Sequence, residues 1–136
     1  MTTKEWLNRA YKLDVEINLL LEEQKAAYER ACGITAVTDS ERVQTSKRNT
    51  TEEKFVSYAA YSDMINKRID ELYEIKNEIL EAINQIENNT LRQLLICRYI
   101  RFMTWESVAV ELDITFQWAH ILHKRALKCV DKFINS

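Results

Sequence analysis

His120, His123 and Cys129 are the side chains in this 136-residue chain that could together bind a transition metal. Imidazole and thiolate are zinc ligands, but structural zinc sites join four of them, usually as two pairs with a recognisable spacing. No second pair accompanies these residues, so the sequence does not predict a metal site. For the two histidines we favour a place beside a phosphate, where protonation would strengthen binding as the pH falls.

Acid–base and nucleophilic chemistry find equally little support in the sequence. The carboxylate pairs Glu22–Glu23 and Glu52–Glu53 are sequence neighbours, which fits solvated or capping charges better than an acid–base couple. No Ser–His–Asp or Cys–His arrangement can be argued. The single Gly is too few for a phosphate-cradling loop, because only a backbone without side chains approaches the anion closely. We therefore expect a protein that is not an enzyme and needs no cofactor.

The composition favours an all-α fold. The chain has no Pro and one Gly, and strand-rich folds use these residues at their frequent turns. Hydrophobic residues make up 46% and charged residues 29%, which allows a core, while no apolar run is long enough to span a membrane. Three Cys without a CxxC pair are typical of a reduced, cytoplasmic protein.

The charges are distributed unevenly along the chain. From Leu91 onward, 7 basic and 4 acidic residues give a net charge of +3. The first 90 residues hold the other 12 basic and 17 acidic residues, a net charge of −5. A basic C-terminal piece behind an acidic N-terminal one points to a nucleic-acid partner.

Two long helices are predicted before residue 90. The capping box Thr2–Glu5 opens the first and Gly33 ends it; a second box, Thr50–Glu53, opens the next helix, which ends at Asn88–Asn89. The first helix has a heptad seam made of Trp6, Ala10, Leu13, Ile17, Leu20, Gln24, Ala27 and Ala31. The second seam comprises Phe55, Tyr58, Ser62, Ile65, Ile69, Leu72, Lys76, Ile79, Ile83 and Ile86. These seams predict a coiled-coil-like antiparallel hairpin over residues 1–89, or pairing with a second copy of the chain.

Residues 33–50 lack periodicity and are rich in Ser, Thr and charged side chains, which predicts a flexible linker. Arg42, Lys47 and Arg48 could contact phosphate there. A solvated linker is the simpler interpretation.

Residues 90–136 are predicted to form shorter helices. A third capping box, Thr90–Gln93, leads a helix that includes Arg98 and Tyr99. Thr104 then caps a short helix over residues 105–112.

A tight turn at Asp113–Ile114 comes next, with Asp113 in the left-handed conformation that Gly often takes. Thr115 caps the last helix, which runs from Phe116 to about Phe133. This order of elements is typical of a helix-turn-helix unit. Its packing residues would be Val108, Ala109, Leu112, Ile114, Ala119, Leu122, Ala126, Leu127 and Val130.

The segment Leu91–Leu127 also resembles region 4 of sigma-70-type transcription factors. The matching residues are Leu91, Leu94, Leu95, Arg98, Tyr99, Thr104, Trp105, Glu106, Val108, Ala109, Leu112, Ile114, Thr115, Leu122, Arg125, Ala126 and Leu127. With the hairpin in front and Arg42–Ser46 in the linker, the chain is similar to small phage and prophage proteins of Gram-positive bacteria. These are described as domains of unknown function or as sigma-like phage transcriptional regulators. The resemblance implies a sigma-like regulator of phage genes that binds double-stranded DNA.

The resemblance further implies that the helix from Phe116 enters the major groove. Base edges would be read by Phe116, Gln117, His120, Ile121 and Lys124. Backbone phosphates would be contacted by Arg98, Arg101, Thr115, Arg125 and Lys128. Gln can bond adenine bidentately, and Phe or Ile can contact a thymine methyl. Sigma factors commonly carry charges at the first recognition positions, where this chain has Phe116–Trp118, so their promoter element is not carried over.

A second interpretation of the same helix remains open. Phe116, Trp118 and Ile121 would form an exposed apolar patch, which is typical of a protein-binding surface. Sigma region 4 contacts RNA polymerase as well as DNA, so the unit could dock on polymerase or another regulator as an adaptor.

Overall fold

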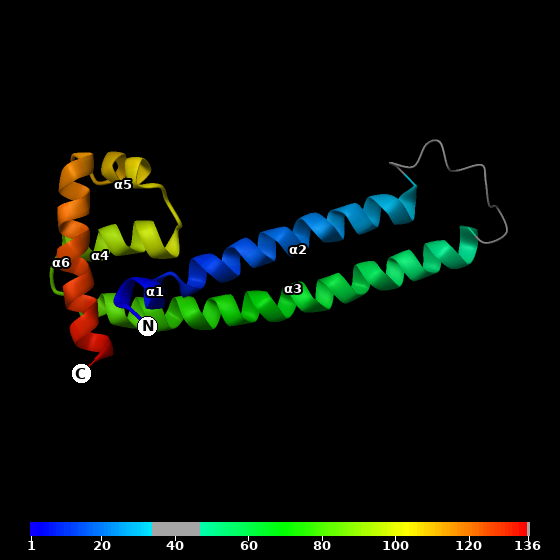
Figure 1. Cartoon of the computed structure of the whole chain (residues 1–136), viewed down its shortest axis with the longest axis horizontal. Coiled ribbons are helices and arrows are strands. Elements are labelled where there is room, and N and C mark those ends of the chain that lie inside the picture. Colours follow the sequence, from blue (N-terminus) through cyan, green and yellow to red (C-terminus); the bar gives the residue numbers. More distant parts are fainter. Residues whose placement is uncertain (34–46, 136) are drawn as a thin grey trace. The chain divides into compact units, whose positions relative to one another are not determined.

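The computed structural model describes residues 1–33 and 47–135, and every regular element in these ranges is helical (Figure 1). The predicted all-α class is confirmed. The elements are α1 (Thr3–Leu7), α2 (Arg9–Cys32), α3 (Lys47–Asn84), α4 (Asn89–Leu95), the π-helical turn η1 (Ile96–Ile100), α5 (Trp105–Glu111) and α6 (Phe116–Ile134).

The packing divides the chain into two compact units, residues 1–13 with 72–136 (unit 1) and residues 14–71 (unit 2). Helices α2 and α3 each contribute a segment to both units. Each unit is a set of residues that contact one another. The predicted division into domains 1–89 and 90–136 stays a prediction.

In unit 2, the segments of α2 and α3 lie side by side (Figure 1) and are joined through their predicted seams. Ile17, Ala27 and Ala31 of α2 and Ile65 of α3 are buried. Residues pair in opposite chain directions, because Glu16 bonds Arg68 at 2.8 Å while Tyr28 lies 5.5 Å from Tyr58, ring to ring. The seams therefore give an antiparallel pairing within this unit.

Two of the polar positions of these seams meet in unit 2, since the Gln24 side-chain amide donates to the Ser62 hydroxyl. Phe55 was expected in the seam but is 42% exposed. Its ring instead packs edge-on against Tyr28, with ring centroids 6.5 Å apart.

Helix α3 begins at Lys47, three residues before the predicted capping box at Thr50. The prediction of a linker to residue 50 is therefore wrong for residues 47–50. No Gly or Pro stands between Lys47 and Thr50 to stop the helix from extending. Residues 34–46, with the predicted phosphate contact of Arg42, lie outside the described residues.

The first predicted helix is interrupted in unit 1. Thr2 caps α1 as expected, its hydroxyl oxygen accepting the Glu5 N–H at 3.2 Å. Asn8, with φ −76° and ψ −4°, separates α1 from α2. Helix α1 packs on α6, and the Thr3 hydroxyl donates to the Asp131 carboxylate at 2.9 Å. At the far end of α2, Gly33 has φ +72°, the left-handed conformation expected of it.

Helix α4 is capped by Asn88, two residues before the predicted Thr90. The side-chain oxygen Oδ1 of Asn88 accepts the Leu91 N–H at 3.1 Å, which places Thr90 inside the helix. Asn is at least as good a cap as Thr, so the helix begins at the earlier of the two candidates. The chain then widens into η1, where the Arg101 N–H reaches the Ile96 carbonyl at 3.0 Å. The sequence pattern does not predict this turn.

Helices α5 and α6 are joined by a tight turn in unit 1. Thr104 and Thr115 cap them as predicted, their hydroxyls accepting the N–H groups of Ser107 and Trp118. The Ile114 N–H bonds the Ala109 carbonyl and the Asp113 N–H bonds the Val110 carbonyl, which is the Schellman arrangement. Asp113 has φ +54°, so the predicted left-handed residue is confirmed.

We expect Asp113→Gly to raise the free energy of unfolding by about 0.5–1 kcal/mol, because Gly adopts this conformation without a steric penalty. Urea denaturation monitored by circular dichroism measures the change. A decrease would mean that the Asp113 side chain contributes a contact that outweighs its backbone strain.

Candidate nucleic-acid interface

The outer face of α6 carries most of the residues predicted to contact DNA. At 100° per residue, Gln117, Ile121, Lys124 and Lys128 fall on one stripe of the helix. All four are exposed, Ile121 by 44%. No acidic residue occurs in α6 before Asp131, so the positive charges of Lys124 and Lys128 make this a cationic stripe.

One edge of this stripe is formed by Trp118 and Arg125. The Arg125 guanidinium lies over the Trp118 ring, 5.2 Å from its centroid. Both side chains are exposed, and Trp118 also lines a shallow depression with Asp113, Ile114 and Thr115. The stacking restricts the rotamers of Arg125 and holds its charge at the edge of the stripe.

The other edge is aromatic. Phe116 packs edge-on against His120, with ring centroids 4.6 Å apart. His120 in turn lies 4.8 Å from the ring of Trp105 on α5. His120 is therefore half-buried, and its side chain belongs to a ring cluster that links α5 to α6.

The opposite face of α6 packs into the core as predicted. Val108 and Ala109 of α5 and Ala119, Leu122, Ala126 and Val130 of α6 are buried. Leu112, Ile114 and Leu127 are half-buried. This packing fixes α6 against α5 and turns the cationic stripe toward solvent.

His123 is buried rather than placed beside a phosphate, which makes that part of the sequence interpretation wrong. Its Nε2 lies 2.6 Å from the hydroxyl of the buried Tyr99, and its ring lies 4.6 Å from that of Trp105. The ring sits on the core face of α6, one turn from Ala119, so it points away from the stripe.

Burial sets the protonation states of this pair. It lowers the pKa of His123 to about 4, with smaller contributions from the charges of Lys4 and Arg98. It also raises the pKa of Tyr99 to about 12. At neutral pH the phenol therefore keeps its proton and donates it to Nε2 of the neutral imidazole.

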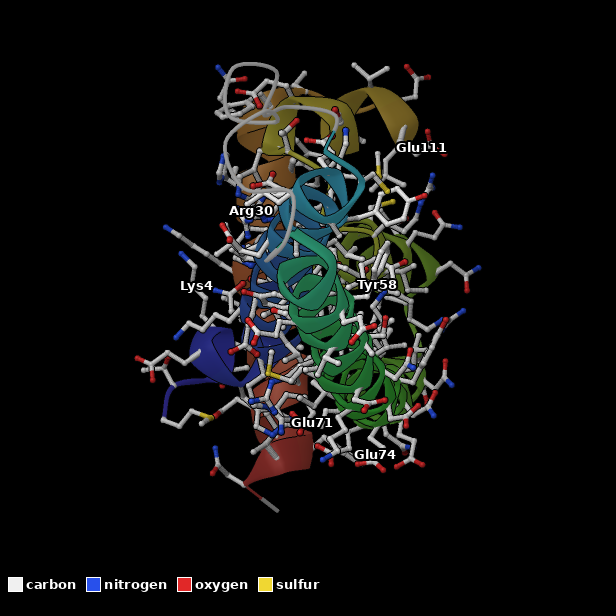
Figure 2. The ribbon with its side chains drawn as sticks, turned by 90° about the vertical axis from the view of Figure 1, so that its right-hand side faces the viewer. Lys4, Arg30, Tyr58, Glu71, Glu74 and Glu111 are labelled. Atoms are coloured by element: carbon white, nitrogen blue, oxygen red, sulfur yellow. The ribbon has the colours of Figure 1, made fainter. Side chains whose placement is uncertain are left out.

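Arg98 of η1 and Arg101 at its C-terminal end, which are predicted to contact phosphates, both have partners within the chain. The Arg98 guanidinium donates to the Met103 carbonyl at 2.8 Å and stacks on Trp105 at 4.8 Å. Arg101 is exposed, and its guanidinium lies 3.8 Å from the carboxylate of Glu111, which projects from the end of α5 (Figure 2). The structure does not bring them onto the α6 stripe, and their contact with DNA stays a prediction.

Thr115 uses its hydroxyl oxygen as the α6 cap, at 3.1 Å from the Trp118 nitrogen. Its hydroxyl proton remains available to a phosphate. Trp105 and Tyr99 match the sigma pattern, but the sequence does not reveal that Trp105 contacts both histidines and that Tyr99 bonds His123. The signal in the sequence that could have indicated these contacts is an aromatic residue, Trp105, on the helix before the pair His120 and His123.

Within the described residues, no group of three His, Cys, Asp or Glu side chains is arranged to hold a metal ion. In the same part of the chain, the structure contains no helix with the length and apolar character needed to span a bilayer.

Comparisons with known proteins give one match. The family model described as a protein of unknown function, DUF1492, matches residues 35–131, more than two thirds of the chain. No curated protein and no solved structure matches this sequence. The matched range includes all of α3, α4 and α5, and the cationic stripe of α6. The chain therefore belongs to the DUF1492 family.

Proposed function

We propose that this protein is a phage-type transcriptional regulator that binds promoter DNA. In this proposal α5 and α6 form a sigma-region-4-like helix-turn-helix, α6 enters the major groove, and α2 with α3 forms an N-terminal hairpin. The observation that carries the proposal is the solvent-facing stripe of Gln117, Ile121, Lys124 and Lys128, backed by a packed core. A rigid helix with a polar and cationic outer face is what groove reading requires.

Four further side chains on the stripe and its edges have a role in this proposal. Arg125, held by Trp118, would contact one strand's phosphates, and Thr115 at the start of α6 would contact another. Phe116 and Ile121, which are 43% and 44% exposed, would contact thymine methyl groups.

Fluorescence anisotropy with labelled duplexes tests the proposal. Duplexes are selected from a random pool by the full chain and then titrated across a range of salt concentrations. We expect specific binding whose logarithmic affinity falls linearly with the logarithm of the salt concentration. Absence of binding at low salt would contradict the proposal.

Gln117→Ala is expected to relax the sequence preference at one base pair by about 1–3 kcal/mol, because the amide can bond both N6 and N7 of adenine. Binding to a set of single-base variants of the selected site measures this. An equal loss on every variant would instead show that Gln117 contacts the backbone.

A second candidate function is docking on RNA polymerase or another regulator without specific DNA binding. It is favoured by the exposure of three large apolar side chains, Phe116, Trp118 and Ile121, at the start of α6. Capture of purified RNA polymerase by a chain that has no affinity for DNA would support this adaptor function. Loss of that capture in Ile121→Ser would place the contact on α6.

The proposal also includes a dimer. Two copies of the chain would pair through the hairpin and present two reading helices to a repeated DNA site. Sedimentation equilibrium of the full chain distinguishes a dimer from a monomer. A monomer at the concentrations used for DNA binding would exclude this arrangement.

A further inference from the structure

A small pocket in unit 1 lies apart from the α6 stripe. It is lined by Asn8, Tyr11, Arg98, Phe102 and Thr104 and has a volume of about 250 Å³. The lining therefore comes from the α1–α2 junction, from η1 and from the loop before α5. This volume lies below the usual range for drug-sized ligands, so the pocket fits a small molecule.

Arg98 supplies the charge of this pocket. Its guanidinium is half-buried, bonded to the Met103 carbonyl at 2.8 Å and stacked on Trp105. Among the described residues it forms no ion pair with a carboxylate, in contrast to Arg9, Arg68 and Arg101. A partly desolvated guanidinium with one carbonyl partner still has N–H donors that favour an anion.

Phe102 forms an apolar wall of the same pocket in a strained conformation. Its φ of +59° lies in the left-handed region, which is rare for a bulky residue. Two contacts hold it there, the edge of Tyr11 at 5.6 Å between ring centroids and the Lys76 ammonium at 4.9 Å from its ring. Strain that is compensated by surrounding contacts is a feature of ligand clamps.

We propose that this pocket binds a small oxyanion, namely the phosphate or carboxylate group of a small molecule. Arg98 holds the anionic group, and the Asn8 amide supplies a neutral polar donor beside it. Phe102 and Tyr11 accept a short apolar portion of the ligand. None of the stripe residues lines the pocket, and Arg98 is the one lining residue that is also a predicted DNA contact.

Calorimetric titration of the full chain with sodium phosphate, and separately with sodium acetate, tests the proposal. Sodium chloride at equal ionic strength is the reference, and the melting temperature is measured in parallel, since a ligand that binds the folded state raises it. We expect saturable binding in the millimolar range, with no counterpart in chloride. A response equal to that of chloride would overturn the proposal.

Two variants test whether the oxyanion binds in this pocket. Asn8→Asp adds a carboxylate beside Arg98 with almost no change in shape, and we expect it to weaken oxyanion binding tenfold or more. Arg98→Gln should do the same, and circular dichroism checks that it remains folded. Lys12→Gln removes an exposed charge next to Tyr11 but outside the pocket lining, and should change the affinity less than twofold.

Unchanged oxyanion binding in Asn8→Asp would overturn the proposal. It would also be overturned if phosphate fails to bind the wild type while Arg98→Gln weakens DNA binding, because Arg98 would then serve the DNA backbone.

Discussion

Exchanging Lys124 and Lys128 together for Glu is expected to lower the affinity for DNA about 100-fold at moderate salt, because two positive charges facing the polyanion, Lys124 in the groove and Lys128 beside the backbone, become repulsive. Both side chains are exposed on the cationic stripe of α6 and form no ion pair within the described chain. Their exchange therefore leaves the core packing of α6 intact. Anisotropy titration with the selected duplex measures the loss.

The salt dependence of DNA binding distinguishes the loss of a direct contact by Lys124 and Lys128 from a general repulsion between a more acidic protein and DNA. Removing these two positive charges from the interface should reduce the slope of log affinity against log salt by about 2. Lys25→Glu with Lys67→Glu is the matched control, since both lysines are exposed in unit 2 and the change in net charge is identical. We expect this control to bind within about threefold of the wild type. Equal losses in the two double variants would show that α6 does not carry the contact.

The helix ends show how far local chemistry predicts this fold. Thr2, Thr104 and Thr115 cap helices as the sequence predicted, and Gly33 and Asp113 take left-handed conformations. Each of these assignments depends on one residue and its immediate neighbours. The assignments at Thr50 and Thr90 were wrong because a capping residue only permits a helix to begin, and earlier residues extended both helices.

The apolar periodicity predicted most of the buried positions in the described residues. Ile17, Ile65, Ile79 and Val130 all lie at seam or core positions expected from helical spacing. Periodicity identifies the inward face of a helix, since residues three and four apart share it.

The contacts of His123 with Tyr99 and Trp105 could not be predicted from residue spacing alone. Tyr99, Trp105 and His123 come from three different elements, and their contact depends on how η1 and α5 pack on α6. The extra residue in the π-helical turn rotates the later residues about the helix axis, so a regular helical wheel fails from Ile96 onward. Arg98, which belongs to the same turn, lines the pocket beside Phe102.

The left-handed Phe102 was equally inaccessible to sequence reasoning. Nothing in an aromatic residue favours φ of +59°. It is the tertiary contacts with Tyr11 and Lys76 that hold it. The sequence therefore predicted which residues of α6 are exposed. It did not predict the conformation of Phe102 in the loop before α5.

Lowering the pH from 7.5 to 4.5 is expected to cost about 2.5 kcal/mol of the free energy of unfolding through His123 alone. Burial holds the pKa of this imidazole at about 4 in the folded chain, against 6.5 when it is exposed. Between these values the unfolded chain binds a proton that the folded chain does not. Stability is therefore lost as the pH falls through this window, and the contribution is constant above about 7 and below about 3.5.

Urea denaturation at the two pH values measures this difference. His123→Gln removes the titrating group, so its loss between pH 7.5 and 4.5 should be smaller than that of the wild type by about 2.5 kcal/mol. The variant is also less stable at neutral pH, because Tyr99 loses its buried acceptor. Gln117→Ala is the control, since Gln117 is an exposed residue of the same helix and does not titrate, and it should keep the wild-type difference. If His123→Gln shows the same pH dependence as the wild type, acid destabilisation comes from the carboxylates, and Tyr99 and His123 stabilise the α5–α6 packing without coupling it to protons.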